Sequence, residues 1–458
     1  REESLNIAFS ELEEDQPKTF DIPNSGGLKL TVVSRAITNG LALGLPNNTR
    51  AVSAFLANYR AVDEKLIYKG CAFQAELELK STSPLLNQPD LRGLSNTDNQ
   101  DWDERLADLQ YRDIKDYAVG HGAATKSITD TAGDCYSVKT TWLPQHEVEL
   151  VSPSTIEGVE FGMHALANCE SSDKLSDILH PLISQYREWI AEQELTISEL
   201  CDSRKSTAKS ALADAKSAAD RMELGINAIA NDDSAFTAFQ IANKAMARSA
   251  QKRLNIELPE WRPFQLAFIL LNIEGIVNQD STEREIVDLL FFPTGGGKTE
   301  AYLGLAAFTM VIRRLRNPGI SYAGLSVLMR YTLRLLTLDQ LGRAAGLMCA
   351  LELEREQNES LGAWPFEIGL WVGSGATPNR MGGSKYRGPG AEYTAYKKVT
   401  QYQKNTKSSS PIPLESCPWC DTDFEARSFK LVPNQSEPEN LEIRCANREC
   451  EFSRDRAL

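Results

Sequence analysis

Apolar and polar residues alternate along much of the first 150 residues, which is the pattern of strands that bury one face. The alternation is clearest in GLKLTVVSRAI (27–37), RAVSAFLANYRAV (50–62) and YKGCAFQAELELKS (68–81), and Gly, Pro, Asn and Asp lie between these stretches. Because such residues favour turns, we expect residues 1–150 to form a β-rich accessory domain, either a sandwich or a barrel-like sheet.

The pattern changes to a helical one from about residue 172. Apolar residues recur three and four positions apart through 174–204 and 207–230, and again in 231–254 after an Asp/Ser capping signal. We therefore expect residues 151–258 to form a helical region. Amphipathic helices normally bury their apolar faces within their own protein, although a partner surface is an alternative.

Strands and helices are expected to alternate after residue 259. EIVDLLFF (285–292), YAGLSVLMRY (322–331) and FEIGLWVGS (366–374) have the character of buried strands, and helical patterns at 298–315 and 333–356 separate them. This order predicts an α/β fold whose parallel sheet is joined by right-handed crossovers. The expected fold class is thus a multidomain α/β protein.

Composition and charge refine this picture. The 458 residues are 42% hydrophobic and 24% charged, as in globular proteins, and length alone suggests two to four domains. No apolar run reaches the roughly 20 residues that span a bilayer, and the polar start has no signal-peptide pattern, so we expect a cytoplasmic protein without membrane contact. The net charge of −14 lies in the first half, since residues 201–458 carry 31 acidic and 32 basic residues.

The stretch FPTGGGKT (292–299) has the character of a phosphate-binding loop. Its glycines allow backbone amides to approach phosphate oxygens at the start of a helix, and Lys298 is placed to neutralise the β- and γ-phosphates. The Thr299 hydroxyl is a candidate ligand of Mg²⁺. Phe292 replaces the first glycine of the general pattern. The alternative is a simple glycine turn, but the apolar strand before the loop and the amphipathic helix after it favour a nucleotide site.

The nine cysteines fall into two groups. Five are scattered, as buried small apolar residues usually are. The other four form two close pairs separated by 24 residues, and these are Cys417, Cys420, Cys445 and Cys450. Paired cysteines at this separation indicate a zinc ribbon with a structural Cys₄ site, and we assign it to residues 401–458. Disulfides are the alternative, which a reducing compartment disfavours.

PTGGGKTE resembles motif I of superfamily 2 helicases and translocases, and WRPFQLAFIL (261–270) looks like their adenine-reading motif. Together with RYTLRLLTLDQ (330–340) and LWVGSGATPN (370–379), these stretches resemble the DrmA family, the helicase-like components of the DISARM anti-phage defence system. The resemblance covers most of residues 30–458. It implies that residues 259–400 are part of a first RecA-like domain, interrupted by the zinc ribbon.

The resemblance also implies roles for single residues. ATP and Mg²⁺ would be held by Arg262, Gln265, Thr294, Gly295, Gly296, Gly297, Lys298, Thr299 and Glu300, of which Lys298 and Thr299 would act in catalysis. DNA, either single-stranded or a duplex with a single-stranded end, would contact Arg330, Thr332 and Arg334 through its phosphates. A DrmB-like protein is the implied partner. No apolar strand after the loop ends in Asp-Glu, so we expect the acidic motif and a second RecA-like domain to follow residue 458.

Two other interpretations remain open at this point. One is another superfamily 2 translocase, such as a restriction-system motor subunit. The other is a non-catalytic zinc-ribbon platform that loads DNA and retains a vestigial ATP site. The complete run from Gly295 to Thr299 favours an active motor over such a platform.

Overall fold

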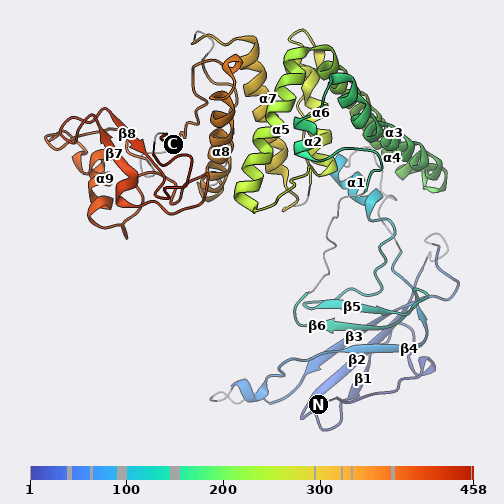
Figure 1. Ribbon diagram of the computed structural model, residues 1–458. Coiled ribbons are helices and arrows are strands. Elements are labelled where there is room, and N and C mark those ends of the chain that lie inside the picture. Colours follow the sequence, from blue (N-terminus) through green and yellow to red (C-terminus); the bar gives the residue numbers. More distant parts are fainter. Residues whose placement is uncertain are drawn as a thin grey trace. The chain divides into compact units, whose positions relative to one another are not determined.

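The computed structural model describes residues 2–38, 44–61, 65, 67–89, 101–144, 155–292, 295–320, 323–331, 334–372, 377–454 and 456–458. The chain forms two compact units (Figure 1). Unit 1 consists of Arg1–Leu150 and Thr196–Ala211, and unit 2 consists of Val151–Leu195 and Leu212–Leu458. Short 3₁₀ turns are η1 (Phe9–Glu11), η3 (Ile67–Gly70), η5 (Ile197–Glu199), η6 (Thr282–Glu285), η8 (Glu359–Leu361), η9 (Ala391–Tyr393) and η10 (Ala426–Ser428).

Unit 1 contains two small antiparallel sheets. The first has the order β1 (Lys18–Asp21), β2 (Leu28–Ala36), β3 (Arg50–Asn58), and the second has the order β4 (Glu78–Leu85), β6 (Cys135–Thr141), β5 (Ala124–Thr129). The central strand β2 buries Val32, Val33 and Ser34. A short helix, α1 (Trp102–Gln110), is held to the start of α4 by a paired hydrogen bond from Arg204 to the carboxylate of Asp108.

Helices dominate unit 2, and apolar periodicity accounts for where they lie. They are α2 (Met163–Ala167), α3 (Ser172–Thr196), α4 (Asp202–Asn231), α5 (Asp233–Leu254), α6 (Pro263–Val277), α7 (Lys298–Arg316), α8 (Arg334–Arg355) and α9 (Ala395–Lys404). The start of α4, up to Ala211, belongs to unit 1. The Asp232 carboxylate caps α5 by accepting from the Ala235 amide at 2.8 Å, and Asn255 ends that helix in the left-handed conformation. Pro263 begins α6 at the position where proline is favoured.

One continuous apolar core joins these helices. Its fully buried side chains include Leu175, Ile226, Phe239, Leu266 and Phe308, contributed by α3, α4, α5, α6 and α7. Helix α5 packs against α2, α7 and α8, as Figure 1 shows for the middle of unit 2. Polar contacts reinforce α5 and α8, because the buried carboxylate of Glu354 accepts from Lys244 and Arg248 at 2.6 Å each.

The parallel sheet that the sequence predicts for unit 2 is not formed by the described residues. Residues 286–292, 323–331 and 364–372 form neither a helix nor a strand ladder. Val287, Leu289 and Phe291 are 94%, 87% and 91% exposed. A parallel strand normally has hydrogen-bonded partners along its edges, and no described residue pairs with these segments in a ladder. The structure is therefore a mixed α/β protein with small sheets, and the parallel sheet at these three places stays a prediction.

The last part of the chain is a compact module built around a hairpin. Strands β7 (Phe429–Val432) and β8 (Asn440–Ile443) pair antiparallel, with Phe429 opposite Ile443. Its aromatic residues Trp419, Phe424, Phe429 and Phe452 are buried and belong to the same core as the helices of unit 2. Within the described residues, no helix is both long enough and apolar enough to cross a bilayer.

Candidate nucleotide site and cysteine cluster

The glycine loop leads directly into α7. Gly295 and Gly297 have positive φ angles of 84° and 91°, and Gly297 is the residue that precedes the first helical residue, Lys298. Alternating positive-φ glycines before a helix turn backbone N–H groups toward one point, where the helix terminus also favours negative charge. The local geometry therefore suits a phosphate. Thr294 lies outside the described residues.

Two residues from the start of α6 are bonded to this loop. Gln265 is 4% exposed and donates from Nε2 to the Gly297 carbonyl at 2.7 Å, while its Oε1 accepts from the Arg262 amide at 2.8 Å. Arg262 donates from Nη1 to the Gly296 carbonyl at 2.8 Å. The structure thus brings together residues that lie more than 30 positions apart. Here Gln265 uses its amide within the protein, so contact with an adenine would require these bonds to be exchanged.

Lys298 folds back over the loop. Its ammonium donates to the carbonyl of Phe292, six residues earlier. The Phe292 ring in turn stacks on Phe264 of α6, with ring centroids 3.9 Å apart and planes inclined by 15°. A bound phosphate would therefore compete with a protein carbonyl for the lysine.

Glu300 connects α7, the helix that follows the glycine loop, to two other helices by ion pairs. Its Oε1 accepts from Arg253 of α5 at 2.7 Å and from Arg343 of α8, and the Glu300 side chain is 18% exposed. Neither arginine was identified from the sequence. They are 47 and 43 residues from Glu300, and no local spacing signals a pairing that only the packing of helices creates.

The segment that leads into the loop is held by α4. The guanidinium of Arg221 donates to both oxygens of Asp288 and also to Glu283, and only 11% of its side chain is exposed. These acidic partners, Asp288 first, raise the pKa of Arg221 above its ordinary value, although burial opposes them. The contact fixes residue 288, seven positions before Gly295.

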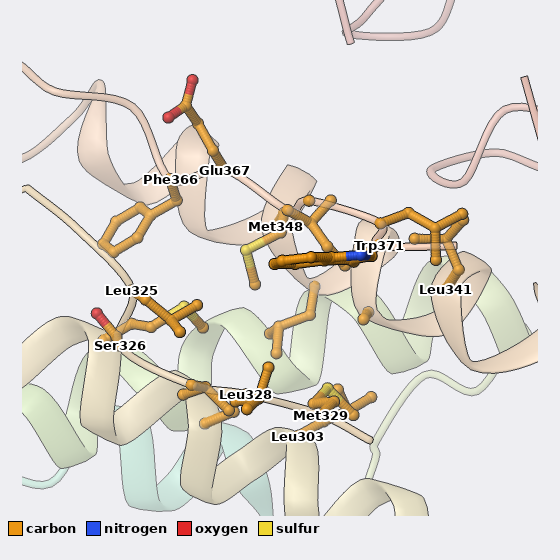
Figure 2. A pocket seen from close by; sticks show the side chains of 18 of the residues that line it. Leu303, Leu325, Ser326, Leu328, Met329, Leu341, Met348, Phe366, Glu367 and Trp371 are labelled. Carbon is orange, nitrogen blue, oxygen red and sulfur yellow. The ribbon is translucent and has the colours of Figure 1, made fainter. Parts of the chain in front are cut away.

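An apolar cavity of about 1000 Å³ lies beside α7 and α8. Its other walls are the segments 324–331 and 364–372, and Figure 2 shows Leu328, Met329, Met348, Phe366 and Trp371 around it. Two of the residues predicted to contact DNA are near this place. Arg330 is exposed and lines the cavity, and Arg334 is the first residue of α8. Thr332, like the side chain of Arg334, is not among the parts that the structure describes.

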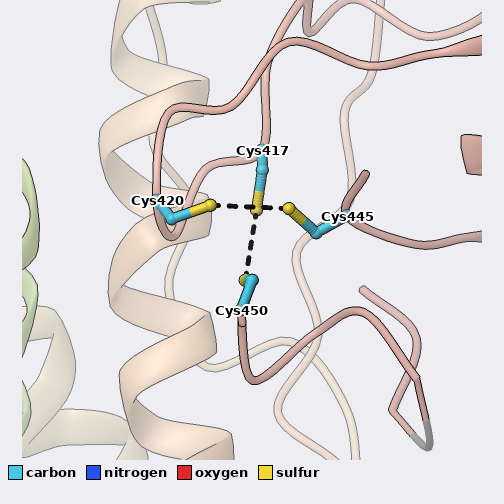
Figure 3. Close-up of side chains that lie close together, drawn as sticks. All are labelled: Cys417, Cys420, Cys445 and Cys450. Atoms are coloured by element: carbon cyan, nitrogen blue, oxygen red, sulfur yellow. Dashed lines mark hydrogen bonds between the residues drawn. The ribbon is translucent and has the colours of Figure 1, made fainter. Parts of the chain in front are cut away.

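The four predicted metal ligands meet at one point. Two loops that flank the β7–β8 hairpin supply them, and Figure 3 shows the sulfurs of Cys417, Cys420, Cys445 and Cys450 facing one another. All four sulfurs lie within 4.8 Å of one another. The Cys420 and Cys445 sulfurs are 3.4 Å apart, and those of Cys417 and Cys450 are 4.0 Å apart. Tetrahedral Zn–S bonds of about 2.3 Å require separations of about 3.8 Å, so the donor set fits Zn²⁺.

Burial disfavours uncompensated thiolates at this cluster. Burial raises the pKa of the Cys417 thiol far above its ordinary range and raises that of Cys450 to about 12. Burial has the same direction at Cys420, but hydrogen bonds led by that with Thr422 outweigh it and lower the pKa. The amides of Asn447 and Phe452 point at the sulfurs of Cys445 and Cys450. Such amides stabilise thiolates once a dication compensates their charge.

Comparison with known proteins places the chain in context. No protein-family model matches it. It is 31% identical over 472 aligned residues to the DISARM protein DrmA of Bacillus paralicheniformis, and the alignment covers 95% of this chain. The same alignment covers 39% of the relative, so the chain spans well under half of that protein's length. The chain is therefore a DrmA-like protein along nearly the whole of its sequence.

Proposed function

We propose that this chain is the nucleotide-binding part of an ATP-dependent superfamily 2 DNA translocase or helicase that acts in the cytoplasm in anti-phage defence. The observation that carries the proposal is the glycine loop at the start of α7, to which Gln265 and Arg262 are bonded. The similarity to DrmA supports the defence role.

In the proposed reaction the chain's residues bind and orient the triphosphate. The loop amides after Gly295 would bind phosphate oxygens, and Lys298 would leave the Phe292 carbonyl to neutralise the γ-phosphate. Thr299 would ligate Mg²⁺, the Lewis acid of phosphoryl transfer. Gln265 bonds to the loop and to the start of α6, where the adenine is expected. Through these two hydrogen bonds, adenine binding would affect the conformation of the phosphate loop.

We further propose that residues 286–292, 323–331 and 364–372 become strands of a RecA-like sheet when additional strands pair with them. The exposed apolar side chains of 286–292 and the apolar cavity beside 324–331 support this, because both present surface that a sheet would bury. One such strand would carry the acidic pair that activates water. Arg330, Thr332 and Arg334 would then lie at the end of a strand, where they would contact DNA phosphates. A DrmB-like protein is the proposed partner.

We assign a structural Zn²⁺ to the four cysteines. The bound ion would cross-link the two loops. It would have no open coordination position for catalysis, since four thiolates complete its tetrahedron. Trp419 and Phe452 pack around the cluster with ring centroids 6.0 Å apart.

A second candidate is a DNA-loading platform whose ATP site is vestigial. The hydrogen bonds of Lys298 and Gln265 to protein carbonyls favour this platform, because they occupy groups that would otherwise bind ATP. Another superfamily 2 motor, such as a restriction-system subunit, would share the same loop. The two motor readings differ in the domains that accompany the loop, whereas the platform differs in having no nucleotide turnover.

The test compares Lys298→Ala with the wild type. Calorimetric titration with ATP and Mg²⁺ should show binding by this chain, and Lys298→Ala should weaken it at least tenfold. In a polypeptide extended to the relative's length, DNA-stimulated hydrolysis should fall by ~10²-fold or more, because a charge that stabilises the transition state is removed. Lys174→Ala is the matched control, since Lys174 is an exposed residue of α3 whose ammonium pairs with the exposed Glu170. Hydrolysis that is absent in the wild type, or that ignores Lys298, would leave the platform as the better account.

A further inference from the structure

Helix α8 lies between the cysteine cluster and the helix that carries the phosphate loop. On one side it contacts α5 and α7, and on the other the loop that contains Cys417 and Cys420 lies against it (Figure 3). All of these elements belong to unit 2 and share its core. A displacement of α8 at one side therefore reaches the other through packed contacts.

The contact on the cluster side is made by backbone. A Cβ atom built on Gly346 would lie 2.9 Å from the carbonyl oxygen of Pro418, which stands between two of the cysteines. Only a glycine allows the loop to come this close to the helix. At Gly342, one turn earlier, a Cβ would meet only the end of the Leu414 side chain at 3.8 Å, which is ordinary contact.

A second contact of α8, made three residues before Gly346, is ionic. Arg343 follows Gly342 in the sequence of α8 and donates to Glu300, the residue after Thr299. Only 20% of the Arg343 side chain and 18% of the Glu300 side chain are exposed. A pair this sheltered from solvent is screened less than a surface pair, so its geometry constrains both helices.

Helix α5 makes a second connection of the same kind. Lys252 lies 3.5 Å from Glu451 and 5.6 Å from the ring centre of Trp419, both in the cysteine module. The next residue, Arg253, donates to Glu300. Of these two adjacent residues of α5, Lys252 contacts the cysteine module and Arg253 contacts α7. In α8, Gly346 and Arg343 make the corresponding two contacts.

We propose that the metal-loaded cysteine module controls the order of the phosphate loop through α5 and α8, with Arg253 and Arg343 as positioning residues that act on Glu300. Zinc keeps the Pro418 loop seated on Gly346. The seated helices hold Glu300, and with it the first turn of α7 that contains Lys298 and Thr299. Loss of the metal by chelation loosens that turn. The importance of this control for turnover rests on the proposed nucleotide site, but the structural coupling does not.

The test is amide hydrogen exchange of the zinc-loaded chain, measured without nucleotide. Chelation should speed exchange in peptides covering 297–303 at least about threefold, and Gly346→Ala should do the same with zinc retained. Gly342→Ala is the matched control, because it makes the same change on the same helix without reaching backbone, and it should leave exchange unchanged. Arg343→Met should loosen 297–303 at full zinc content, and Arg343→Lys should restore part of the protection.

The outcomes separate the possibilities. Faster exchange confined to 411–454 after chelation would overturn the coupling. A rise that also includes α3 would mark unfolding of the whole unit and would equally contradict it. A parallel titration with ATP and Mg²⁺ tests the nucleotide site by itself. Coupling without nucleotide protection would reject the proposed function and keep this inference, whereas protection without coupling would do the reverse.

Discussion

Gln265 illustrates how one side chain joins two motifs that are far apart in the sequence. It is nearly buried, and both atoms of its amide bond with backbone, one with the loop and one with the start of α6. Its removal breaks two part-buried hydrogen bonds and leaves the Gly297 carbonyl and the Arg262 amide without this partner, which is costlier than losing an exposed hydrogen bond. The residue therefore matters to stability as well as to any ligand.

We expect Gln265→Glu to destabilise unit 2 by about 1–3 kcal/mol and to weaken nucleotide binding, because a carboxylate would replace the donor and face the Gly297 carbonyl. Thermal unfolding and calorimetric titration of the variant measure the two effects. Gln251→Glu is the matched control, since Gln251 donates to the Glu257 carbonyl at an exposed site. Equal stability of both variants would contradict the role of Gln265.

Glycine has a comparable role at Gly297. Its φ of 91° lies in the left-handed region, and a Cβ there would come within 2.7 Å of Gln265 Nε2. The sequence predicted that glycines allow close approach to phosphate. The structure adds that this glycine also makes room for the glutamine that holds the loop.

At the scale of elements, residues at helix ends connect neighbouring helices of unit 2. Asp232 caps α5 and also pairs with Arg316 at the end of α7, so one carboxylate fixes two helices. Burial alone would raise the pKa of Asp232, but the Ala235 amide and Arg316 outweigh it and lower the pKa below its ordinary value. A carboxyl group whose pKa is lower in the folded state stabilises the fold at pH values above its pKa in the unfolded chain. This contribution is lost as the pH falls through its pKa in the folded state.

We expect Asp232→Ala to reduce the free energy of unfolding by about 1–2 kcal/mol at neutral pH, the usual loss for a helix cap. Asp232→Asn should cost less, because an amide oxygen still accepts from Ala235. Urea unfolding at several pH values measures this. The difference between wild type and Asp232→Ala should stay constant above about pH 5 and shrink below about pH 4. A difference that grows in acid would reverse the assigned sign.

At the scale of the whole molecule, two small sheets, a helical unit and a cysteine module share one chain. The module belongs to the helical core through Trp419, Phe424 and Phe452. A metal that closes this module stabilises the folded state directly, since the unfolded chain does not present four gathered thiolates.

We expect one Zn²⁺ per chain, and Cys417→Ser should abolish stoichiometric binding and lower the unfolding temperature. Elemental analysis measures the zinc content, and thermal unfolding followed by near-ultraviolet circular dichroism, to which Trp419 contributes among seven tryptophans, measures the unfolding temperature. Cys201→Ser is the matched control, because Cys201 is exposed and outside the cluster. Full zinc content in Cys417→Ser would show that the metal is held elsewhere.

Much of the local structure was predictable from the sequence. The helices of 172–254 follow apolar spacing and cap residues, and two of the loop's glycines, Gly295 and Gly297, adopt positive φ angles. The cysteine spacing predicted a cluster that the structure assembles. The parallel sheet expected from 285–292, 322–331 and 366–374 stays a prediction, since a strand exists only through its partners and the described residues of these stretches form no ladder.

The sequence by itself determined the features that depend on near neighbours along the chain, namely the helices, the glycine loop and the paired cysteines. Capping, periodicity and ligand spacing act within a few residues, so a single sequence carries them in full. Only the tertiary structure decided which distant charges meet. Arg253 and Arg343 converge on Glu300, and Pro418 rests on Gly346, because helix packing brings together residues that no local pattern links.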